Sequence, residues 1–254
     1  MTERLDATVA LVTGASSGIG EATARALAAR GAAVALAARR KDRLDTLAKE
    51  IGEAGGRALV IQADVTDRDQ AVAAVTRTVE ELGRLDTVVN NAGVMLLGPI
   101  VDAPVEEWDR MVGLNVQGLL YVAHAALPHL LDAAESSGRR VADLVNISSV
   151  AGRVARSGSG VYNLTKHGVG AFSESLRQEV TGRHVRVSLV EPGAVDTELR
   201  THLGPAGREI VERRFSAFEV LQAPDIADAV EYIVTRPRHV AVNEILIRPT
   251  EQEG

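Results

Sequence analysis

The sequence of 254 residues has 46% hydrophobic and 24% charged residues, no cysteine and a formal net charge of −6, as is typical of a globular protein with one large domain. The lack of cysteine excludes disulfides, thiolate nucleophiles, iron–sulfur clusters and cysteine-ligated zinc, and the negative charge argues against binding to nucleic acid through its phosphate backbone. No apolar stretch reaches the ~18 residues of a membrane span, and the first residues resemble neither a signal peptide nor a transit peptide, so we expect a cytoplasmic protein with no membrane partner.

Short apolar runs alternate with amphipathic helical patterns along the whole chain. The runs are rich in β-branched residues and mostly apolar throughout, as in strands that are buried on both faces of a parallel sheet. The predicted strands span residues 9–13, 33–38, 58–64, 87–93, 143–149, 185–193 and 244–249, and the predicted helices span residues 20–31, 42–55, 69–83, 105–131, 162–182 and 224–237. This alternation predicts one α/β domain over residues 1–254, a Rossmann-type doubly wound parallel sheet with helices on both faces.

The stretch TGASSGIG, residues 13–20, lies between the first strand and the first helix. Its three glycines permit a tight turn and the close approach of a pyrophosphate, and the helix N-terminus adds free N–H groups and a positive dipole end. A glycine-rich turn can also be an ordinary strand–helix connection, and the position after the first strand is what favours a phosphate site. The predicted contacts are Gly14, Ser16, Ser17, Gly18, Ile19 and Gly20.

The end of the second predicted strand determines which dinucleotide such a domain binds. An acidic residue there accepts hydrogen bonds from the adenosine ribose and repels a 2′-phosphate. Here Ala38 stands in place of that carboxylate, and Arg39 and Arg40 follow it. A guanidinium binds a phosphate through two hydrogen bonds, so we predict NADP(H) rather than NAD(H). The alternative is a solvated, basic start to the next helix.

Two further strand ends meet the same edge of the predicted sheet. Asp64 and Val65 end the third strand and suit the adenine edge of the cofactor. Asn91, Ala92 and Gly93 end the fourth strand, close to the point where the strand order of a doubly wound sheet reverses and ligands bind.

Tyr162 and Lys166 are four residues apart and share a helix face, in a chain with only three tyrosines and three lysines. Ser149 precedes Tyr162 by 13 residues, at the end of the fifth predicted strand. An adjacent ammonium and a bound nicotinamide cation favour the phenolate and lower the pKa of a tyrosine from about 10. Tyr162 then exchanges a proton with a carbonyl oxygen that Ser149 holds. Taken alone, the spacing is also that of two polar residues on a helix.

These motifs together resemble the classical short-chain dehydrogenase/reductase family. The matching segments are TGASSGIG, NNAG, LNVQG, the run from SSVAG to YNLTK, and the dipeptide PG at residues 192–193, and they cover essentially the whole chain in the family's order. No matched position departs from the family pattern. The resemblance implies a single Rossmann-type domain with a seven-stranded parallel sheet.

The resemblance also assigns roles to individual residues. It implies that Tyr162 is the acid/base, that Ser149 orients the carbonyl and that Lys166 contacts the nicotinamide ribose. It implies that Asn115 holds a water in a proton relay. The residues it places at the nicotinamide carboxamide are Pro192, Gly193, Val195 and Thr197, and Arg39 matches the NADP-preferring pattern.

The predicted activity is that of an NADPH-dependent carbonyl reductase, an alcohol dehydrogenase in the reverse direction. Looser likeness to the clavulanic acid dehydrogenase group and to NADP-dependent 3-hydroxy acid dehydrogenases implies a small or medium aldehyde, ketone or 3-oxo acid as substrate. The alternatives are an NAD-linked alcohol dehydrogenase and a non-catalytic dinucleotide-binding regulator.

The segment 194–223 has neither a strand nor a helix pattern, and we expect it to be the substrate loop. Arg153 and Arg156 are candidates for contact with an anionic substrate, against the alternatives of a solvated loop or a subunit contact. No carboxylate–histidine cluster indicates a metal site. The apolar faces of residues 105–131 and 162–181 predict a subunit interface, and the resemblance implies a homotetramer.

Overall fold

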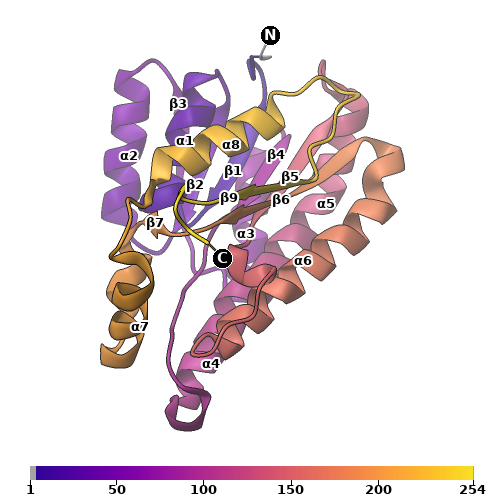
Figure 1. Ribbon diagram of the computed structural model, residues 1–254. Coiled ribbons are helices and arrows are strands. Elements are labelled where there is room, and N and C mark those ends of the chain that lie inside the picture. Colours follow the sequence, from indigo (N-terminus) through magenta and orange to yellow (C-terminus); the bar gives the residue numbers. More distant parts are fainter. Residues whose placement is uncertain (1–3, 254) are drawn as a thin grey trace.

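Seven of the apolar runs form one parallel sheet in the computed structural model, which describes residues 4–253. The strand order is β3-β2-β1-β4-β5-β6-β9 (Figure 1). The strands are β1 (Val9–Thr13), β2 (Ala33–Ala38), β3 (Arg57–Gln62), β4 (Thr87–Asn90), β5 (Ala142–Ile147), β6 (Val185–Pro192) and β9 (Glu244–Ile247). Since β1 pairs with β2 on one side and with β4 on the other, the strand order reverses at β1, and a crevice is expected above the carboxyl ends of β1 and β4.

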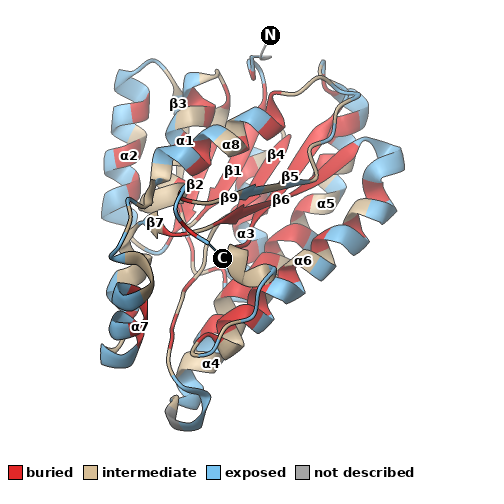
Figure 2. Cartoon of the chain, viewed as in Figure 1, coloured by how far each residue is buried: buried red, intermediate tan, exposed pale blue. Residues whose placement is uncertain are grey.

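Six helices cover the sheet, three on each face (Figure 1). One face holds α1 (Gly18–Ala29), α2 (Lys41–Glu53) and α8 (Ala223–Val234), and the other holds α3 (Arg68–Leu82), α5 (Leu119–Ser136) and α6 (Gly160–Val180). Successive strand residues enter opposite cores, so that Leu11 packs on one face while Ala10 and Val12 pack on the other. Both faces are therefore buried, as the red strands of Figure 2 show, which explains why the strands are apolar throughout. This architecture confirms the predicted fold.

The apolar stretch 105–131, predicted as one helix, is continuous but changes its winding. It begins as α4 (Val105–Val112), continues as a π-helical turn, η2 (Gly113–Gly118), and resumes as α5. A π turn inserts one residue into the helical repeat and rotates the side chains that follow. Asn115 lies within this turn. Periodicity alone did not reveal this local change.

The segment 194–223 is not irregular, as the sequence suggested, but contains a helix of its own. The short strands β7 (Val195–Asp196) and β8 (Leu221–Gln222) pair at its base, and η5 (Glu198–His202) and α7 (Pro205–Phe215) lie between them. Ile210 and Val211 on α7 join a small apolar cluster with Leu97 and Tyr162. The segment is therefore a built element that packs beside the site. The remaining short helices are η1 (Ile100–Asp102), η3 (Val150–Gly152) and η4 (Thr181–Arg183).

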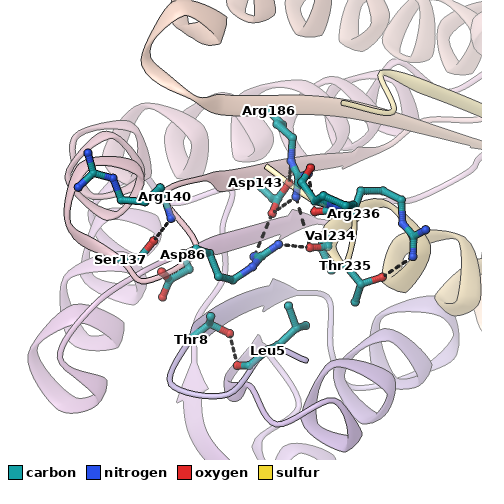
Figure 3. Close-up of polar contacts among 12 residues, drawn as sticks. Leu5, Thr8, Asp86, Ser137, Arg140, Asp143, Arg186, Val234, Thr235 and Arg236 are labelled. Carbon is teal, nitrogen blue, oxygen red and sulfur yellow. Dashed lines mark hydrogen bonds and ion pairs between the residues drawn. The ribbon is translucent and has the colours of Figure 1, made fainter. Parts of the chain in front are cut away.

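Buried carboxylates in ion pairs hold the amino ends of the central strands, and Figure 3 shows the pair of Arg186 with Asp143. The Arg186 guanidinium donates hydrogen bonds of 2.7 and 3.0 Å to the Asp143 carboxylate, and both side chains are almost inaccessible to solvent. Arg186 also bonds the carbonyl of Val240, which fixes the chain after α8. Asp86 pairs with Arg84 and accepts a hydrogen bond from the Val9 backbone. These charges lie at the end of the sheet opposite the expected crevice. Across residues 4–253, no helix combines the length and apolar character needed to cross a bilayer.

Candidate active site

A cleft of about 350 Å³ lies above the carboxyl ends of the strands, where the strand order predicts a ligand. It brings together most of the residues that the sequence singled out. Its lining includes Gly14, Ser16, Ser17, Gly18, Ile19, Arg39, Arg40, Asp64, Val65, Asn91, Ala92, Gly93, Ser149, Tyr162, Lys166, Pro192, Gly193, Val195 and Thr197. Gly20 and Asn115 are outside this lining.

The glycine turn is closed by contacts that no larger residue permits. Gly14 has φ of +66°, and a Cβ there would lie 2.8 Å from Asn91 Nδ2, which donates to the Thr13 carbonyl at 2.9 Å. Gly20 lies beneath the turn, where a Cβ would collide with the same Asn91 amide and with the Gly14 carbonyl. Its role in the fold is therefore the close packing of α1 against the turn. The turn and the N-terminus of α1 fit a pyrophosphate.

The two arginines after β2 differ in their surroundings. Arg39 is largely exposed, with a guanidinium nitrogen 4.0 Å from the Asp64 carboxylate. Arg40 reaches across the glycine turn and donates to the hydroxyls of Ser16 and Ser17. It also donates to Glu198, at 2.7 Å. Arg40 and the two serine hydroxyls are thus donors that suit a phosphate, and the Glu198 carboxylate is the anion that Arg40 now binds.

Ser149, Tyr162 and Lys166 are all buried at the other end of the cleft. Ser149 is the N-cap of η3 and accepts a hydrogen bond from the Ala151 backbone, which fixes its hydroxyl at the end of β5. Lys166 Nζ donates to the Ile147 carbonyl at 2.9 Å and lies 5.8 Å from the centre of the Tyr162 ring. The three side chains thus converge from one strand end and one helix.

Burial changes the acidity of both titratable groups. It raises the pKa of the Tyr162 phenol, while interaction with the Ser149 side chain lowers it. It also lowers the pKa of the Lys166 ammonium to about 8. The sequence led us to expect that the lysine ammonium and a bound nicotinamide cation together lower the tyrosine pKa. In the structure the ammonium is directed at the Ile147 carbonyl, and burial has the larger effect on the phenol. The phenol is therefore protonated at neutral pH.

Asn115 does not line the cleft, but its side chain holds the segment that follows β4. Its Oδ1 accepts from the Val94 backbone at 2.8 Å, and its Nδ2 donates to the Val94 carbonyl at 2.9 Å and to Thr165 Oγ1 at 3.3 Å. Both amide protons are thus engaged within the protein. The side chain connects the π turn, the segment after β4 and α6.

The turn after β6 is held by a residue that the sequence did not reveal. The Ala194 N–H donates to Gln252 Oε1 at 2.9 Å, and the Gly193 N–H donates to the Ile247 carbonyl at 2.7 Å. A Cβ at Gly193 would collide with the Gln252 side chain. Gln252 is 58 residues from Ala194, so only the folded chain shows that it shapes this wall of the cleft.

The two arginines of the loop after Ser149 have different positions. Arg153 pairs with the buried Glu191 and with Glu244, and it does not line the cleft. It is therefore not a contact of this cleft but part of an ion-pair network at the surface, with its own side chain 41% exposed to solvent. Arg156 does line the cleft. Other lining residues that the sequence did not single out are Glu198, Arg200, His202, Val211, Arg214 and Phe215.

The end of the cleft that holds Tyr162 has both apolar and basic walls. Met95, Leu97, Val211 and Phe215 provide apolar walls beside the basic side chains. Within the described part of the chain, no three histidine or acidic side chains are placed to hold a metal ion.

Comparison with known proteins identifies the family of the chain. The sequence profile of the short chain dehydrogenase family matches residues 8–207. The chain is 39% identical to an uncharacterized oxidoreductase of Staphylococcus aureus, SAR2567. The 241 aligned residues cover 95% of this chain and 96% of that protein. Among solved structures, it is similar to the closed form of serine dehydrogenase complexed with NADP+ (TM-score 0.86, 32% identity, 97% of both chains). It is also similar to an alcohol dehydrogenase from the archaeon Thermococcus sibiricus complexed with 5-hydroxy-NADP (TM-score 0.84, 30% identity, 97% of this chain and 98% of that chain). The chain therefore belongs to the short-chain dehydrogenase/reductase family.

Proposed function

We propose that the protein is an NADP(H)-dependent carbonyl reductase that acts on a small or medium aldehyde, ketone or 3-oxo acid. The observation that carries this proposal is the burial of Ser149, Tyr162 and Lys166 together at one end of a cleft whose other end is a phosphate-type glycine turn. When bound, the cofactor supplies the hydride that reduces the carbonyl carbon. The protein supplies the proton and the orientation.

In this proposal Tyr162 is the general acid. Because burial raises its pKa, the phenol is protonated at neutral pH and can donate its proton to the carbonyl oxygen. Ser149, whose hydroxyl is fixed at the end of β5, donates a hydrogen bond to the same oxygen and stabilises the negative charge that develops there. The carbonyl thereby becomes a hydroxyl group.

Lys166 and Asn115 act behind the phenol. The Lys166 ammonium has N–H donors beyond the one that it gives to the Ile147 carbonyl, and these donors would hold the ribose hydroxyls of the nicotinamide half. The amide protons of Asn115 are engaged by Val94 and Thr165, so we place the relay water at the main chain of the π turn, where regular helical bonding is altered.

The preference for NADP(H) rests on the surroundings of Arg40. Ala38 leaves no carboxylate at the end of β2, and Arg40 is directed to the Ser16 and Ser17 hydroxyls, with Arg39 beside it. The similar serine dehydrogenase and the Thermococcus enzyme are complexes with NADP+ and a modified NADP. Residues 198–215, comprising η5 and α7, form the lid over the substrate end in this proposal.

The test is the loss of NADPH absorbance with a panel of aldehydes, ketones and 3-oxo acids. Tyr162→Phe removes the proton donor and is expected to lower turnover by about 100-fold or more while NADPH affinity stays within a few-fold. Tight NADPH binding without turnover of any carbonyl would instead identify a dinucleotide-binding regulator. Unchanged turnover in Tyr162→Phe would disprove the assignment of the acid.

We further propose that the protein assembles as a homotetramer through α4, α5 and α6. Leu164 on α6 is 63% exposed, and Val105 at the start of α4 is also exposed. The mass of the purified protein in solution, from light scattering, tests this directly. Leu164→Glu is expected to dissociate the assembly, since a buried interface does not accept an unpaired charge.

A further inference from the structure

The substrate end of the cleft concentrates positive charge. Arg156, Arg200 and Arg214 line it, from the loop after η3, from η5 and from α7. Among the described lining residues only Asp64 and Glu198 are acidic, and Glu198 is paired with Arg40 and Arg43 at the adenosine end. Three arginines thus line one end of the cleft in a chain whose net charge is −6.

These arginines differ in their partners from three arginines of the ion-pair networks described above. Arg84, Arg153 and Arg186 each face a buried carboxylate. Arg214 instead donates to Ser159 Oγ at 3.2 Å and to the Ser157 carbonyl at 2.6 Å, both uncharged. No ion pair joins Arg214 to any residue in 4–253.

Arg200 and Arg156 are also without an acidic partner among the described residues. The Arg200 guanidinium lies 6.0 Å from the centre of the Phe215 ring, and its Nη2 is buried without a hydrogen-bond partner. A buried, unpartnered donor on a charged group is destabilising unless a ligand supplies the acceptor. Burial and repulsion from Arg156 and Arg213 lower the pKa of Arg214, as expected for cations crowded without a counter-ion.

We propose that Arg156, Arg200 and Arg214 bind a carboxylate on the substrate, so that the protein reduces carbonyl compounds that are themselves anions. This inference rests on the proposed reductase function and specifies its substrate class. A carboxylate accepts two parallel hydrogen bonds from a guanidinium, and the apolar wall of Leu97, Val211 and Phe215 accommodates the carbon chain that joins it to the carbonyl. The three arginines are specificity-determining residues in this scheme.

The experiment compares an oxo acid with its own methyl ester, which has the same chain and carbonyl but no charge. The wild-type protein is expected to have a kcat/KM at least about tenfold higher for the acid, the scale of a hydrogen bond to a charged group. Arg200→Met, which retains the aliphatic stem, should remove that advantage and leave the ester within about twofold. Arg200→Lys should restore part of it, and Arg213→Gln, on α7 but outside the cleft, is the matched control for a general change in charge.

The outcomes separate two failures. Equal kcat/KM for acid and ester in the wild-type protein overturns the carboxylate site and leaves the reductase proposal intact. Turnover of neither compound, nor of any other carbonyl, overturns the reductase proposal itself. Equal losses for acid and ester in Arg200→Met would show a structural role for this arginine and would also overturn the site.

A different observation concerns Glu198, at the start of the lid. Its carboxylate bridges Arg40, at 2.7 Å, and Arg43, at 2.5 Å, although it is more than 150 residues away from both in sequence. These two cations lower the pKa of Glu198 to about 2, so it is ionised at neutral pH. Arg40 holds the Ser16 and Ser17 hydroxyls with the same guanidinium. An internal carboxylate thus occupies the place that the proposed function assigns to the 2′-phosphate.

We propose that Glu198 competes with the 2′-phosphate for Arg40 and thereby sets the affinity for NADP(H). Two anions repel each other at one guanidinium, so the phosphate must displace Glu198, which retains Arg43 as its partner on α2. The lid then remains tethered while Arg40 is released to the cofactor. This inference, too, rests on the proposed NADP(H) function.

Binding of two nucleotide fragments by calorimetry tests the competition without any turnover. Glu198→Gln should tighten adenosine 2′,5′-bisphosphate by about three- to fivefold, the upper range of a partly exposed charge interaction, and leave adenosine 5′-diphosphate within about twofold. Glu209→Gln, an exposed acid on the same lid, is the control and should change neither. Unchanged or weaker binding of the 2′-phosphate compound in Glu198→Gln overturns the inference. If the wild-type protein does not prefer the 2′-phosphate compound at all, the NADP(H) proposal fails instead.

Discussion

The ion pair between Arg153 and Glu191 determines how firmly the loop after Ser149 is held to the sheet. Glu191 is 1% exposed and is the last residue but one of β6, and Arg153 Nε lies 2.8 Å from both of its carboxylate oxygens. Arg153→Met retains the aliphatic stem and leaves a buried carboxylate without its cation. Removing one partner of a fully buried pair costs about 3–5 kcal/mol. Because Arg153 is itself 41% exposed, water replaces part of the interaction, and we expect about 2 kcal/mol.

Urea unfolding measures this loss, and for a chain of this size it corresponds to a melting temperature lower by roughly 4–8 °C. The double variant Arg153→Met, Glu191→Gln has no buried charge and should recover most of the stability. A loss below about 0.5 kcal/mol in the single variant, the range of ordinary surface substitutions, would refute the argument. Equal instability of single and double variants would refute it as well, because the unpaired charge would then not be the cause.

Other changes test the cofactor end and the buried lysine. Replacing Arg39 and Arg40 with Ala should weaken NADPH far more than NADH in a binding titration, and equal losses would show that these arginines do not recognise the 2′-phosphate. Since burial lowers the pKa of Lys166 to about 8, the ammonium is lost and NADPH affinity should decrease as the pH rises from 7 to 9. The variant Lys166→Met should bind NADPH more weakly and show no such pH dependence. A wild-type affinity that does not change with pH would contradict this prediction. Gly14→Ala places a Cβ 2.8 Å from Asn91 Nδ2 at a positive φ and should abolish NADPH binding. Gly52→Ala, in α2 with open space around it, should bind normally and raise stability by about 0.5–1 kcal/mol, and normal binding by both variants would exclude a role for the tight turn.

The sequence predicted those parts of the site whose residues are close together in the sequence. The glycine turn adjoins the strand and helix that define it, and Tyr162 and Lys166 are neighbours on one helix. The strand ends could be placed because a doubly wound sheet brings all its carboxyl ends to one edge. Each of these inferences needs only nearby residues and a fold rule.

Contacts between distant segments could not be found in this way. Glu198 meets Arg40 across 158 residues and Gln252 meets Ala194 across 58, and no spacing rule joins such pairs. The helix α7 was missed because it begins with Pro205 and Gly207 and has a weakly apolar face in a charged stretch. Its place is decided by packing against Leu97 and Leu203, which only the tertiary structure supplies.

The charged network at the amino ends of the strands has a consequence for how this protein can be altered. Asp143, Arg186 and Asp86 hold the strands together at the end of the sheet opposite the cleft. The stability of the sheet therefore does not depend on the side chains that line the cleft. An engineer can therefore exchange residues 198–215 as a unit, to change which substrates are accepted, without rebuilding the sheet. The same separation lets natural variation explore new substrates on a framework whose stability is secured elsewhere.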